Sequence, residues 1–297
     1  MIYTDRVCER AYAKINLHLD ITGRLEGGFH AVSTVMQTLS LCDEVTVSDI
    51  AEAEKNEFFV SCNVSDVPTD DSNLAVKAAK LFCERVGICL FARIHIEKNI
   101  PMAAGMAGGS ADGAAVLRGL NRALGEPLTV GELCAIGSKL GADVPFCIVG
   151  GTVYADGKGD ILHELPKMPE CVIVAACEGE GVSTPWAYRL LDGIYGNFTE
   201  DSVYVPKSTD GLITALEKGD VKAVAANIYN IFEPPVLSER PVAERVKGML
   251  LDGGAVAAMM SGSGPSVFGI FLCEKCAKGA AELIKKNGFT PYVCRPM

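Results

Sequence analysis

The segment of this chain that says most about chemistry is the glycine-rich stretch 101–115, Pro-Met-Ala-Ala-Gly-Met-Ala-Gly-Gly-Ser-Ala-Asp-Gly-Ala-Ala, which leads into a helical pattern. Glycines let a backbone approach an anion without an obstructing Cβ, and the first free N–H groups of a helix favour negative charge. The segment therefore predicts a phosphate-binding loop and a nucleotide-using enzyme, with Ser110 as the N-cap and Asp112 in the first turn. A flexible turn that binds no ligand is the alternative.

This loop differs from the two commonest phosphate-binding signatures. Gly157-Lys158 is followed by Gly159 and lacks the upstream glycine of a Walker A loop, and no expected strand leads into Gly-x-Gly-x-x-Gly. The sequence therefore disfavours a P-loop ATPase, a dinucleotide-binding dehydrogenase and a eukaryotic-type protein kinase.

Two other segments carry polar side chains that could do chemistry. Residues 11–21 alternate as a strand does, with Lys14, Asn16, His18 and Asp20 on one face and Ile15, Leu17, Leu19 and Ile21 on the other. Alternation by itself favours a strand with one solvated face. Asp143 lies in Gly-Ala-Asp-Val-Pro, on an expected turn just before an apolar strand, where a single Asp is more often structural.

Composition narrows the classes of function. A formal net charge of −10 without a Lys/Arg run argues against binding a nucleic acid polymer. The twelve cysteines are expected to be reduced thiols in a cytoplasmic protein, because no signal peptide precedes them. Cys273-Glu-Lys-Cys276 has metal or redox spacing but no second pair, so zinc or redox chemistry is the lesser alternative.

The remaining patterns indicate how the chain is organised. Strands are expected at 43–49, 57–64 and 91–98, and helices at 72–86, at 110–124 and from a capping box at Thr129 to Gly141. Pro166 and Pro169 mark a domain junction. The second half is expected to contain strand 171–176, helices 184–192, 210–218 and 239–251, strands 255–260 and 266–271, helix 275–287 and strand 291–294. That order suits a ferredoxin-like α+β sandwich, with 193–209 as a surface loop.

Three separated segments together resemble the motifs of the GHMP kinases. They are Ala13-Lys-Ile-Asn16, the Pro101–Ala111 loop and Ser261-Gly-Ser-Gly-Pro-Ser266. Further segments resemble the branch that phosphorylates cytidine-diphosphate methylerythritol in the non-mevalonate route to isoprenoids: Gly27-Gly-Phe-His30, Asn73-Leu-Ala-Val-Lys-Ala-Ala and Leu140-Gly-Ala-Asp-Val-Pro145. The chain departs from the family at Ala103, Ala107 and Ala111, where glycine or serine is usual, which excludes a hydroxyl role at position 111.

The resemblance implies a two-domain α+β fold. Residues 1–164 would form an ATP-binding domain like domain 2 of ribosomal protein S5, and residues 165–297 a ferredoxin-like C-terminal domain. ATP would be the phosphoryl donor, with Mg²⁺ held mainly by the nucleotide and no metal-ligating side chains. The partner would be the small-molecule substrate, with no nucleic acid or membrane, and the protein a monomer or homodimer.

The resemblance also implies roles for individual residues. Asp143 would accept the proton of the C2 hydroxyl, and Lys14 would orient Asp143 and stabilise the transferred phosphoryl group. The substrate would be bound by Asn16, Phe29, His30 and Tyr188, with Trp186 as a possible further member of the cytidine pocket. The residues expected at ATP are Asn73, Lys98, Pro101, Met102, Ala103, Ala104, Gly105, Met106, Ala107, Gly108, Gly109, Ser110 and Ala111.

Two alternative functions remain open on the sequence. One is another GHMP small-molecule kinase, acting on homoserine or mevalonate, against which Phe29-His30 and Gly-Ala-Asp-Val-Pro argue. The other is a non-catalytic nucleotide-binding sensor, against which the retention of both Lys14 and Asp143 argues.

Overall fold

The computed structural model describes residues 2–177, 181–198 and 204–297, and the chain divides into two compact units. Unit 1 comprises Met1–Ala13, Cys42–Ile100 and Ala107–Gly150; unit 2 comprises Lys14–Leu41, Pro101–Met106 and Gly151–Met297. Each unit has its own cluster of buried hydrophobic side chains. The two-domain boundary expected between residues 164 and 165 stays a prediction.

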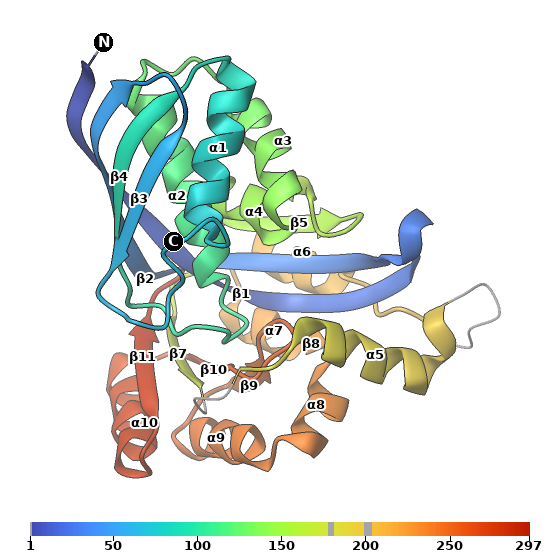
Figure 1. The fold of residues 1–297 in the computed structure, drawn as a ribbon. Coiled ribbons are helices and arrows are strands. Elements are labelled where there is room, and N and C mark those ends of the chain that lie inside the picture. The colour runs from blue at the N-terminus through green and yellow to red at the C-terminus, as the bar shows by residue number, and fades with distance from the viewer. Residues whose placement is uncertain (1, 178–180, 199–203) are drawn as a thin grey trace. The chain divides into compact units, whose positions relative to one another are not determined.

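Two long strands contribute residues to both units. They are β1 (Ile2–Arg24) and β2 (His30–Glu52), joined through the short 3-10 turn η1 (Glu26–Gly28), and both are blue in Figure 1. The sequence pattern identified only 11–21 and 43–49 within them. Residues 32–39 of β2 are all buried, whether polar or apolar, so the alternation that marks a half-solvated strand is absent there.

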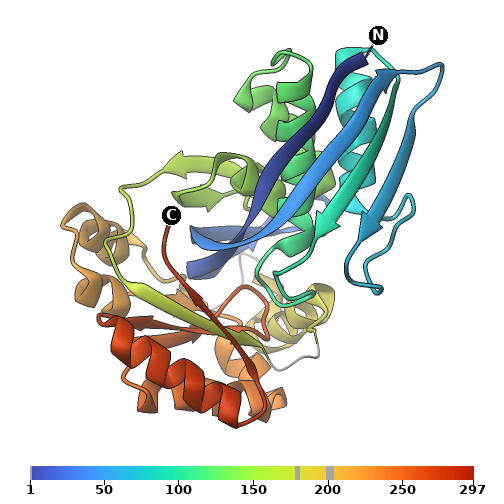
Figure 2. The same cartoon turned by 90° about the vertical axis from the view of Figure 1, so that its left-hand side faces the viewer.

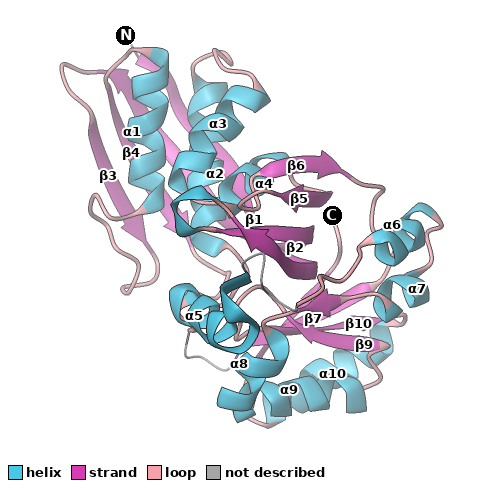
Figure 3. Ribbon diagram, turned by 90° about the vertical axis from the view of Figure 1, so that its right-hand side faces the viewer, coloured by secondary structure: helices cyan, strands magenta, loops and turns pink. Residues whose placement is uncertain are grey.

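In unit 1, helices cover a sheet whose middle strand is β4 (Leu90–Glu97). β4 pairs in parallel with β3 (Glu57–Cys62) and antiparallel with the Glu44–Glu52 part of β2. Figure 3 shows α1 (Leu74–Val86) beside these strands, and α2 (Gly108–Ala123), α3 (Val130–Leu140) and α4 (Asp143–Val149) complete the unit. The capping box at Thr129 and Glu132 is confirmed, as is the end of α1 at a left-handed Gly87.

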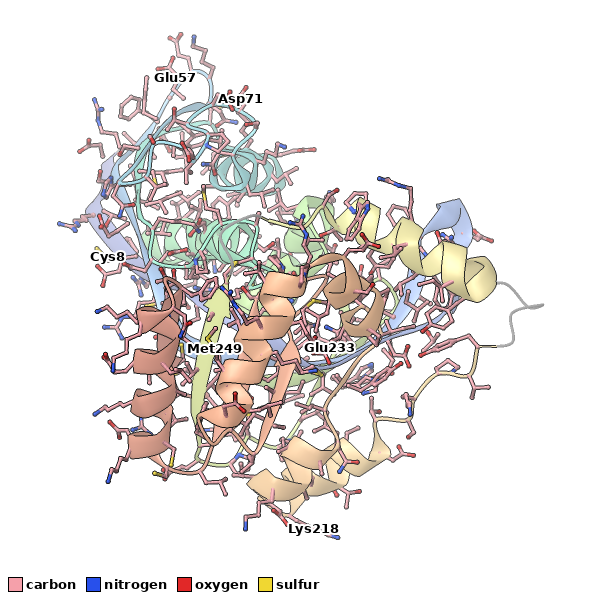
Figure 4. All side chains as sticks on the ribbon, turned by 90° about the horizontal axis from the view of Figure 1, so that it is seen from below. Cys8, Glu57, Asp71, Lys218, Glu233 and Met249 are labelled. Atoms are coloured by element: carbon pink, nitrogen blue, oxygen red, sulfur yellow. The ribbon has the colours of Figure 1, made fainter. Side chains whose placement is uncertain are left out.

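Unit 2 contains the ferredoxin-like layer that the sequence order predicted. Its four antiparallel strands are β7 (Val172–Cys177), β9 (Ala257–Met260), β10 (Val267–Phe271) and β11 (Thr290–Cys294), in the order β11-β7-β10-β9. Helices α9 (Pro241–Asp252) and α10 (Glu274–Lys286) pack on this sheet, orange and red in Figure 2. Buried Met249 of α9 belongs to the core of this unit, and its position is labelled in Figure 4 with Glu233 of α8 (Glu233–Glu239).

Two further strands of unit 2 pair with the unit-2 parts of β1 and β2. β5 (Thr152–Asp156) pairs with residues 34–37 of β2 and with β6 (Ile161–Glu164), and β8 (Tyr229–Asn230) pairs in parallel with His18 and Leu19 of β1. The other elements are α5 (Thr184–Tyr195), η2 (Gly196–Phe198), α6 (Asp210–Glu217) and α7 (Val221–Ala226). Within the described residues, no helix is long and apolar enough to cross a membrane.

Several expectations for local structure were wrong. Residues 143–149, expected as a strand after a turn, form helix α4, and α7 and α8 were not expected at all. The expected loop 193–209 is helical through Tyr195 and continues as η2, while its residues 199–203 lie outside the described part of the chain. A short apolar run cannot distinguish strand from helix by periodicity, and Pro145 is tolerated in the first turn of α4.

Candidate active site

The polar face of β1 is buried, contrary to the solvated face that its alternation favoured. Lys14, Asn16, His18 and Asp20 are between 0% and 3% exposed, as inaccessible as the apolar residues between them. Burying polar groups is costly unless they are hydrogen-bonded, so their partners define what this face can do.

A chain of hydrogen bonds begins at Lys14 and fixes Asn16. Lys14 Nζ donates to Asn16 Oδ1 at 2.5 Å, and Asn16 Nδ2 donates to Thr34 Oγ1 at 2.9 Å. The Thr34 hydroxyl in turn donates to the carbonyl of His18 at 2.7 Å. Because each donor is matched to an acceptor, the amide of Asn16 has one orientation, beside a primary ammonium group.

The next two residues of this face differ sharply from each other. Asp20 accepts from the Tyr204 hydroxyl at 2.6 Å and from the backbone N–H groups of Lys207 and Ile21, while burial raises its pKa above the usual range. In His18 neither ring nitrogen has a hydrogen-bond partner within the described residues, and burial lowers its pKa to about 4. His18 is therefore a neutral buried ring, 5.6 Å from the ring of Tyr229.

Three of the sequence motifs meet within unit 2. The backbone N–H of Lys14 donates to the carbonyl of Met106 at 3.2 Å, and the hydroxyl of Ser261 donates to the carbonyl of Gly105 at 3.0 Å. A Cβ on Gly105, whose φ is +72°, would collide with the carbonyl oxygen of Ser261, and a Cβ on Gly262 would lie 3.5 Å from Asn16 Oδ1. The two glycine-rich loops thus pack backbone to backbone next to Asn16.

Asn230 holds the second of these loops. Its buried amide donates to the carbonyls of Met260 and Gly262 at 2.7 and 2.9 Å and accepts from the N–H of Phe232. The shape of the 261–264 turn is therefore set from β8.

Residues 107–111 belong to unit 1 and begin helix α2 at Gly108. Its N-cap is Ala107, which has a left-handed φ of +59° and no side-chain group that could cap the helix. The expected N-cap at Ser110 was therefore wrong. Asp112 is also beyond the first turn, because the helix starts two residues earlier than expected. Among the described residues no side chain caps the first N–H groups of α2, and uncapped N–H groups at a helix start can accommodate an anion.

Lys98 lies next to the start of α2, since a Cβ on Gly108 would be 2.9 Å from Lys98 Nζ. Its ammonium donates to Asp43 Oδ2 at 2.6 Å and to Asp112 Oδ2 at 2.7 Å, and all three side chains are at most 5% exposed. Asp43 also accepts from the N–H groups of Asn99 and Ile100, whereas Asp112 Oδ1 is buried without a partner among the described residues. Burial raises the pKa of the Asp112 carboxyl; the Lys98 ammonium opposes this rise, and the negative charge of Asp43 adds to it.

Asn73, expected near the adenine, is the N-cap of α1. Its Oδ1 accepts from the N–H of Ala75 at 2.8 Å and its Nδ2 donates to the carbonyl of Pro68 at 2.6 Å. Both polar atoms of this side chain therefore have local structural partners.

Asp143 is the first residue of α4, in unit 1, and is partly exposed. Helix α4 is anchored against α3, because Val144 and Ile148 approach so closely that a Cβ on Gly137 would be 3.0 Å from each. Lys14 belongs to unit 2, so the expected pairing of these two side chains stays a prediction.

The residues expected around a cytidine lie in unit 2. The ring of His30, at the start of β2, is 4.5 Å from the ring of Tyr188 on α5. Phe29 is 54% exposed, with the Lys158 ammonium 3.9 Å from its ring centroid, and Trp186 packs partly buried against the core of the unit. His30 Nε2 is 2.7 Å from Asp192 Oδ1, and Asp192 Oδ2 is 2.7 Å from Arg24 Nη2.

The residues that support these side chains were not predicted from the sequence. They are Thr34 at Asn16, Asp43 and Asp112 at Lys98, Asn230 at the second glycine loop, and Asp192 and Arg24 at His30. One of them carried a signal, because Asp192 is four residues after Tyr188 on an expected helix and so shares its face. The others come from distant segments, and no local pattern brings them together.

The cysteine side chains form no disulfide bonds. All twelve cysteines are free thiols, including the solvent-exposed Cys8 labelled in Figure 4. In the part of the chain that the structure describes, no group of three or more His, Cys, Asp or Glu side chains could hold a metal ion.

Two protein-family models match this chain. The model of the GHMP kinases N terminal domain matches residues 73–151, which include the whole of the first glycine-rich loop and Asp143. The model of the GHMP kinases C terminal domain matches residues 212–287, which include Ser261–Ser266.

Individual relatives match nearly the whole chain. It is 41% identical over 276 residues to the 4-diphosphocytidyl-2-C-methyl-D-erythritol kinase of Caldicellulosiruptor saccharolyticus, covering 93% of this chain and 92% of the relative. It is 40% identical over 284 residues to the enzyme of the same name from Acetivibrio thermocellus, covering 96% of each.

Solved structures share the fold. A crystal structure of 4-(cytidine 5'-diphospho)-2C-methyl-D-erythritol kinase is 30% identical, with a TM-score of 0.78 over 98% of this chain and 99% of that one. A homoserine kinase from Cytophaga hutchinsonii is 19% identical, with a TM-score of 0.75 over 100% and 96%. The expected two-part α+β fold is thereby confirmed.

Proposed function

Because this chain belongs to the GHMP kinase family and is an ATP-dependent small-molecule kinase, we propose that its substrate is 4-diphosphocytidyl-2-C-methyl-D-erythritol. The products are the 2-phosphate of that compound and ADP, and the reaction belongs to the non-mevalonate route to isoprenoids. Support comes from the relatives of that name at 40–41% identity over more than nine-tenths of the chain.

The observation that carries the proposal is the junction of motifs around Asn16. Lys14 and Asn16 are buried on one strand face, and both glycine-rich loops approach the same residues. An ammonium and a fixed amide beside two glycine-rich loops suit a substrate hydroxyl placed next to phosphate.

In the proposed reaction, the carboxylate of Asp143 accepts the proton of the C2 hydroxyl. The oxygen of that hydroxyl bonds to the γ-phosphorus of ATP while the bond from this phosphorus to the β–γ bridging oxygen breaks, and ADP leaves. Lys14 orients Asp143 and places positive charge next to the transferred phosphoryl group, and Asn16 binds the polyol. Positioning and electrostatics supply most of the acceleration of such a transfer.

For ATP, we propose that residues 101–111 enclose the phosphates, with the uncapped start of α2 facing their negative charge. Asn73 and Lys98 would lie near the adenine, positioned by their bonds to Pro68, Ala75, Asp43 and Asp112. Mg²⁺ would enter with ATP, take its oxygen ligands chiefly from phosphates and water, and neutralise charge on the phosphates.

For the cytidine, we propose a pocket made by Phe29, His30 and Tyr188. The exposed ring of Phe29 and the ring of Tyr188 offer stacking surfaces, and the imidazole of His30 offers a hydrogen-bonding edge beside Tyr188. Aromatic stacking of a single base contributes about 1–3 kcal/mol.

A substrate panel tests the proposal. ADP release is measured in a coupled assay with ATP and, in turn, 4-diphosphocytidyl-2-C-methyl-D-erythritol, methylerythritol phosphate, homoserine and mevalonate. We expect the cytidyl compound to exceed methylerythritol phosphate in kcat/KM by roughly two orders of magnitude, the effect of losing one or two stacking contacts. Turnover of homoserine or mevalonate in preference to the cytidyl compound would overturn the substrate assignment and leave the family unchanged.

A further inference from the structure

His30 in unit 2 is the last of three polar side chains that contact one another in a row, Arg24, Asp192 and His30. Arg24, at the end of β1, donates through Nη2 to Asp192 Oδ2 at 2.7 Å, and Asp192 Oδ1 lies 2.7 Å from His30 Nε2. Arg24 is itself anchored by donating through Nη1 to the carbonyl of Gly28 at 2.8 Å. The row thus fixes the side chain of Asp192 at both of its oxygens.

This row determines which nitrogen of His30 carries a proton. An arginine only donates hydrogen bonds, so Asp192 Oδ2 accepts from Arg24, and a carboxylate has no hydrogen to donate through Oδ1. His30 Nε2 must then be the N–H, and in the neutral ring Nδ1 is an acceptor. Within the described residues, Nδ1 has no hydrogen-bond partner, so the acceptor is available for a ligand.

We propose that Asp192, held by Arg24, is a positioning residue that makes His30 Nδ1 a hydrogen-bond acceptor, and that this acceptor selects cytosine over uracil. The inference rests on the proposed function, because it takes His30 to face the base of the substrate. Cytosine presents an amino donor at position 4 of its ring, whereas uracil presents a carbonyl acceptor there. Nδ1 therefore binds the first and repels the second, while Tyr188, 4.5 Å from the imidazole, flanks the same base.

The conservative variant Asp192→Asn gives the sharpest test. Because Arg24 only donates, the amide oxygen of the new side chain turns to Arg24, and its NH₂ group donates to His30 Nε2. The imidazole proton then moves to Nδ1, which becomes a donor, as happens when an amide replaces the carboxylate of an Asp–His pair. A donor at Nδ1 suits the carbonyl of uracil, so the preference between the bases should fall or invert.

Two readouts follow this change. In the wild type, ¹⁵N NMR of the histidine rings should show His30 with its proton on Nε2, and in Asp192→Asn with its proton on Nδ1. By calorimetry, cytidine 5'-diphosphate should bind the wild type at least about tenfold more tightly than uridine 5'-diphosphate, the effect of one hydrogen bond. Asp192→Asn should remove this preference, and Asp192→Glu should retain part of it.

A matched control separates this role from general stability. Glu9 is a carboxylate held by Arg118 and Arg122 in unit 1, with a side chain 13% exposed against 19% for Asp192. Glu9→Gln therefore removes a comparable ion pair without touching a histidine, and it should leave the base preference unchanged.

The outcomes distinguish the inference from the proposed function. If the wild type phosphorylates the cytidyl compound but Asp192→Asn keeps both the Nε2 proton and the full cytosine preference, the inference fails and the function stands. If the wild type has no such activity and binds neither nucleotide, the proposed function and the inference both fail. A wild-type ring protonated on Nδ1 contradicts the inference whatever the activity.

Discussion

Two charged clusters in this molecule each have one central side chain that contacts two others, but the clusters differ in how deeply their side chains are buried. In unit 1, Lys98 lies between Asp43 and Asp112, with side chains at most 5% exposed. In unit 2, Asp192 lies between Arg24 and His30, with side chains 9–26% exposed. The first cluster is almost fully buried and joins three segments of the fold, while the second is partly open to solvent. The two clusters therefore differ in burial more than in the number of ion pairs.

The largest expected effect is on the almost fully buried cluster. Lys98→Met should lower the free energy of unfolding by about 3–5 kcal/mol, because it leaves two carboxylates buried without their cation. Arg24→Met in the open cluster should cost only about 0–1 kcal/mol, since solvent replaces the lost partner. Urea denaturation of the two variants measures both values, and equal losses would mean that burial does not separate the clusters.

His18 extends the comparison, because it is a buried ionisable ring whose nitrogens have no hydrogen-bond partner among the described residues. Burial holds its folded-state pKa at about 4, below the ordinary 6.5, so the unfolded chain binds the proton more readily. The associated stability is fully present above pH 6.5 and is lost as pH falls toward 4. The loss amounts to about 3 kcal/mol, from a difference of about 2.5 units in pKa.

His18→Phe provides the control for this pH dependence. Phenylalanine keeps a ring against Tyr229 and removes two buried nitrogens that have no partner among the described residues. Urea midpoints between pH 7 and pH 4.5 should therefore fall less steeply in the variant than in the wild type. Parallel curves would contradict the assignment of this slope to His18.

Alanine substitutions at two adjacent glycines at the start of α2 should change the stability by smaller amounts and in opposite directions. A Cβ on Gly108 would be 2.9 Å from Lys98 Nζ, which two carboxylates hold in place, so Gly108→Ala should cost about 1–3 kcal/mol. A Cβ on Gly109 would meet only Leu74 Cδ1 at 3.7 Å, so Gly109→Ala should be stabilising by about 0.5–1 kcal/mol. Thermal melts of both variants test this contrast, and a loss of stability in Gly109→Ala would contradict it.

The smallest expected effect concerns the cysteine thiols, whose reactivity also depends on burial. Burial raises the pKa of Cys83 and Cys171 to about 12, whereas a hydrogen bond from the backbone of Cys276 lowers the pKa of exposed Cys273. Iodoacetamide should label Cys273 of the native protein and spare Cys83 and Cys171, as mass spectrometry of peptides would show. A reducing agent should leave the melting temperature unchanged, and a marked shift would reveal a disulfide.

Local patterns in the sequence predicted much of the fold because they depend on neighbouring residues. The capping box at Thr129 and the left-handed Gly87 are short-range signals, and both are present as expected. The strand order β11-β7-β10-β9 also followed from the order of the elements along the chain.

What the sequence could not predict depends on contacts between distant segments. The buried polar face of β1 is covered by side chains such as Thr34 and Tyr204, so its alternation resembled that of a solvated strand. The N-cap of α2 was misplaced because left-handed Ala107 replaces a capping hydroxyl. Nor could the sequence predict that a Cβ on Gly108 would meet the Lys98 ammonium, because the two residues are ten positions apart and become neighbours only in the folded unit.

In the proposed reaction Asp143 removes the proton from the substrate hydroxyl, and the variant Asp143→Asn tests this role most directly. Turnover of ATP with 4-diphosphocytidyl-2-C-methyl-D-erythritol is compared with ATP affinity from calorimetry, using Asp252→Asn at the exposed end of α9 as the control. We expect kcat to fall by at least roughly 10²- to 10⁴-fold, as for a missing general base, with ATP affinity and stability close to wild type. A kcat near that of the wild type would exclude Asp143 from the reaction.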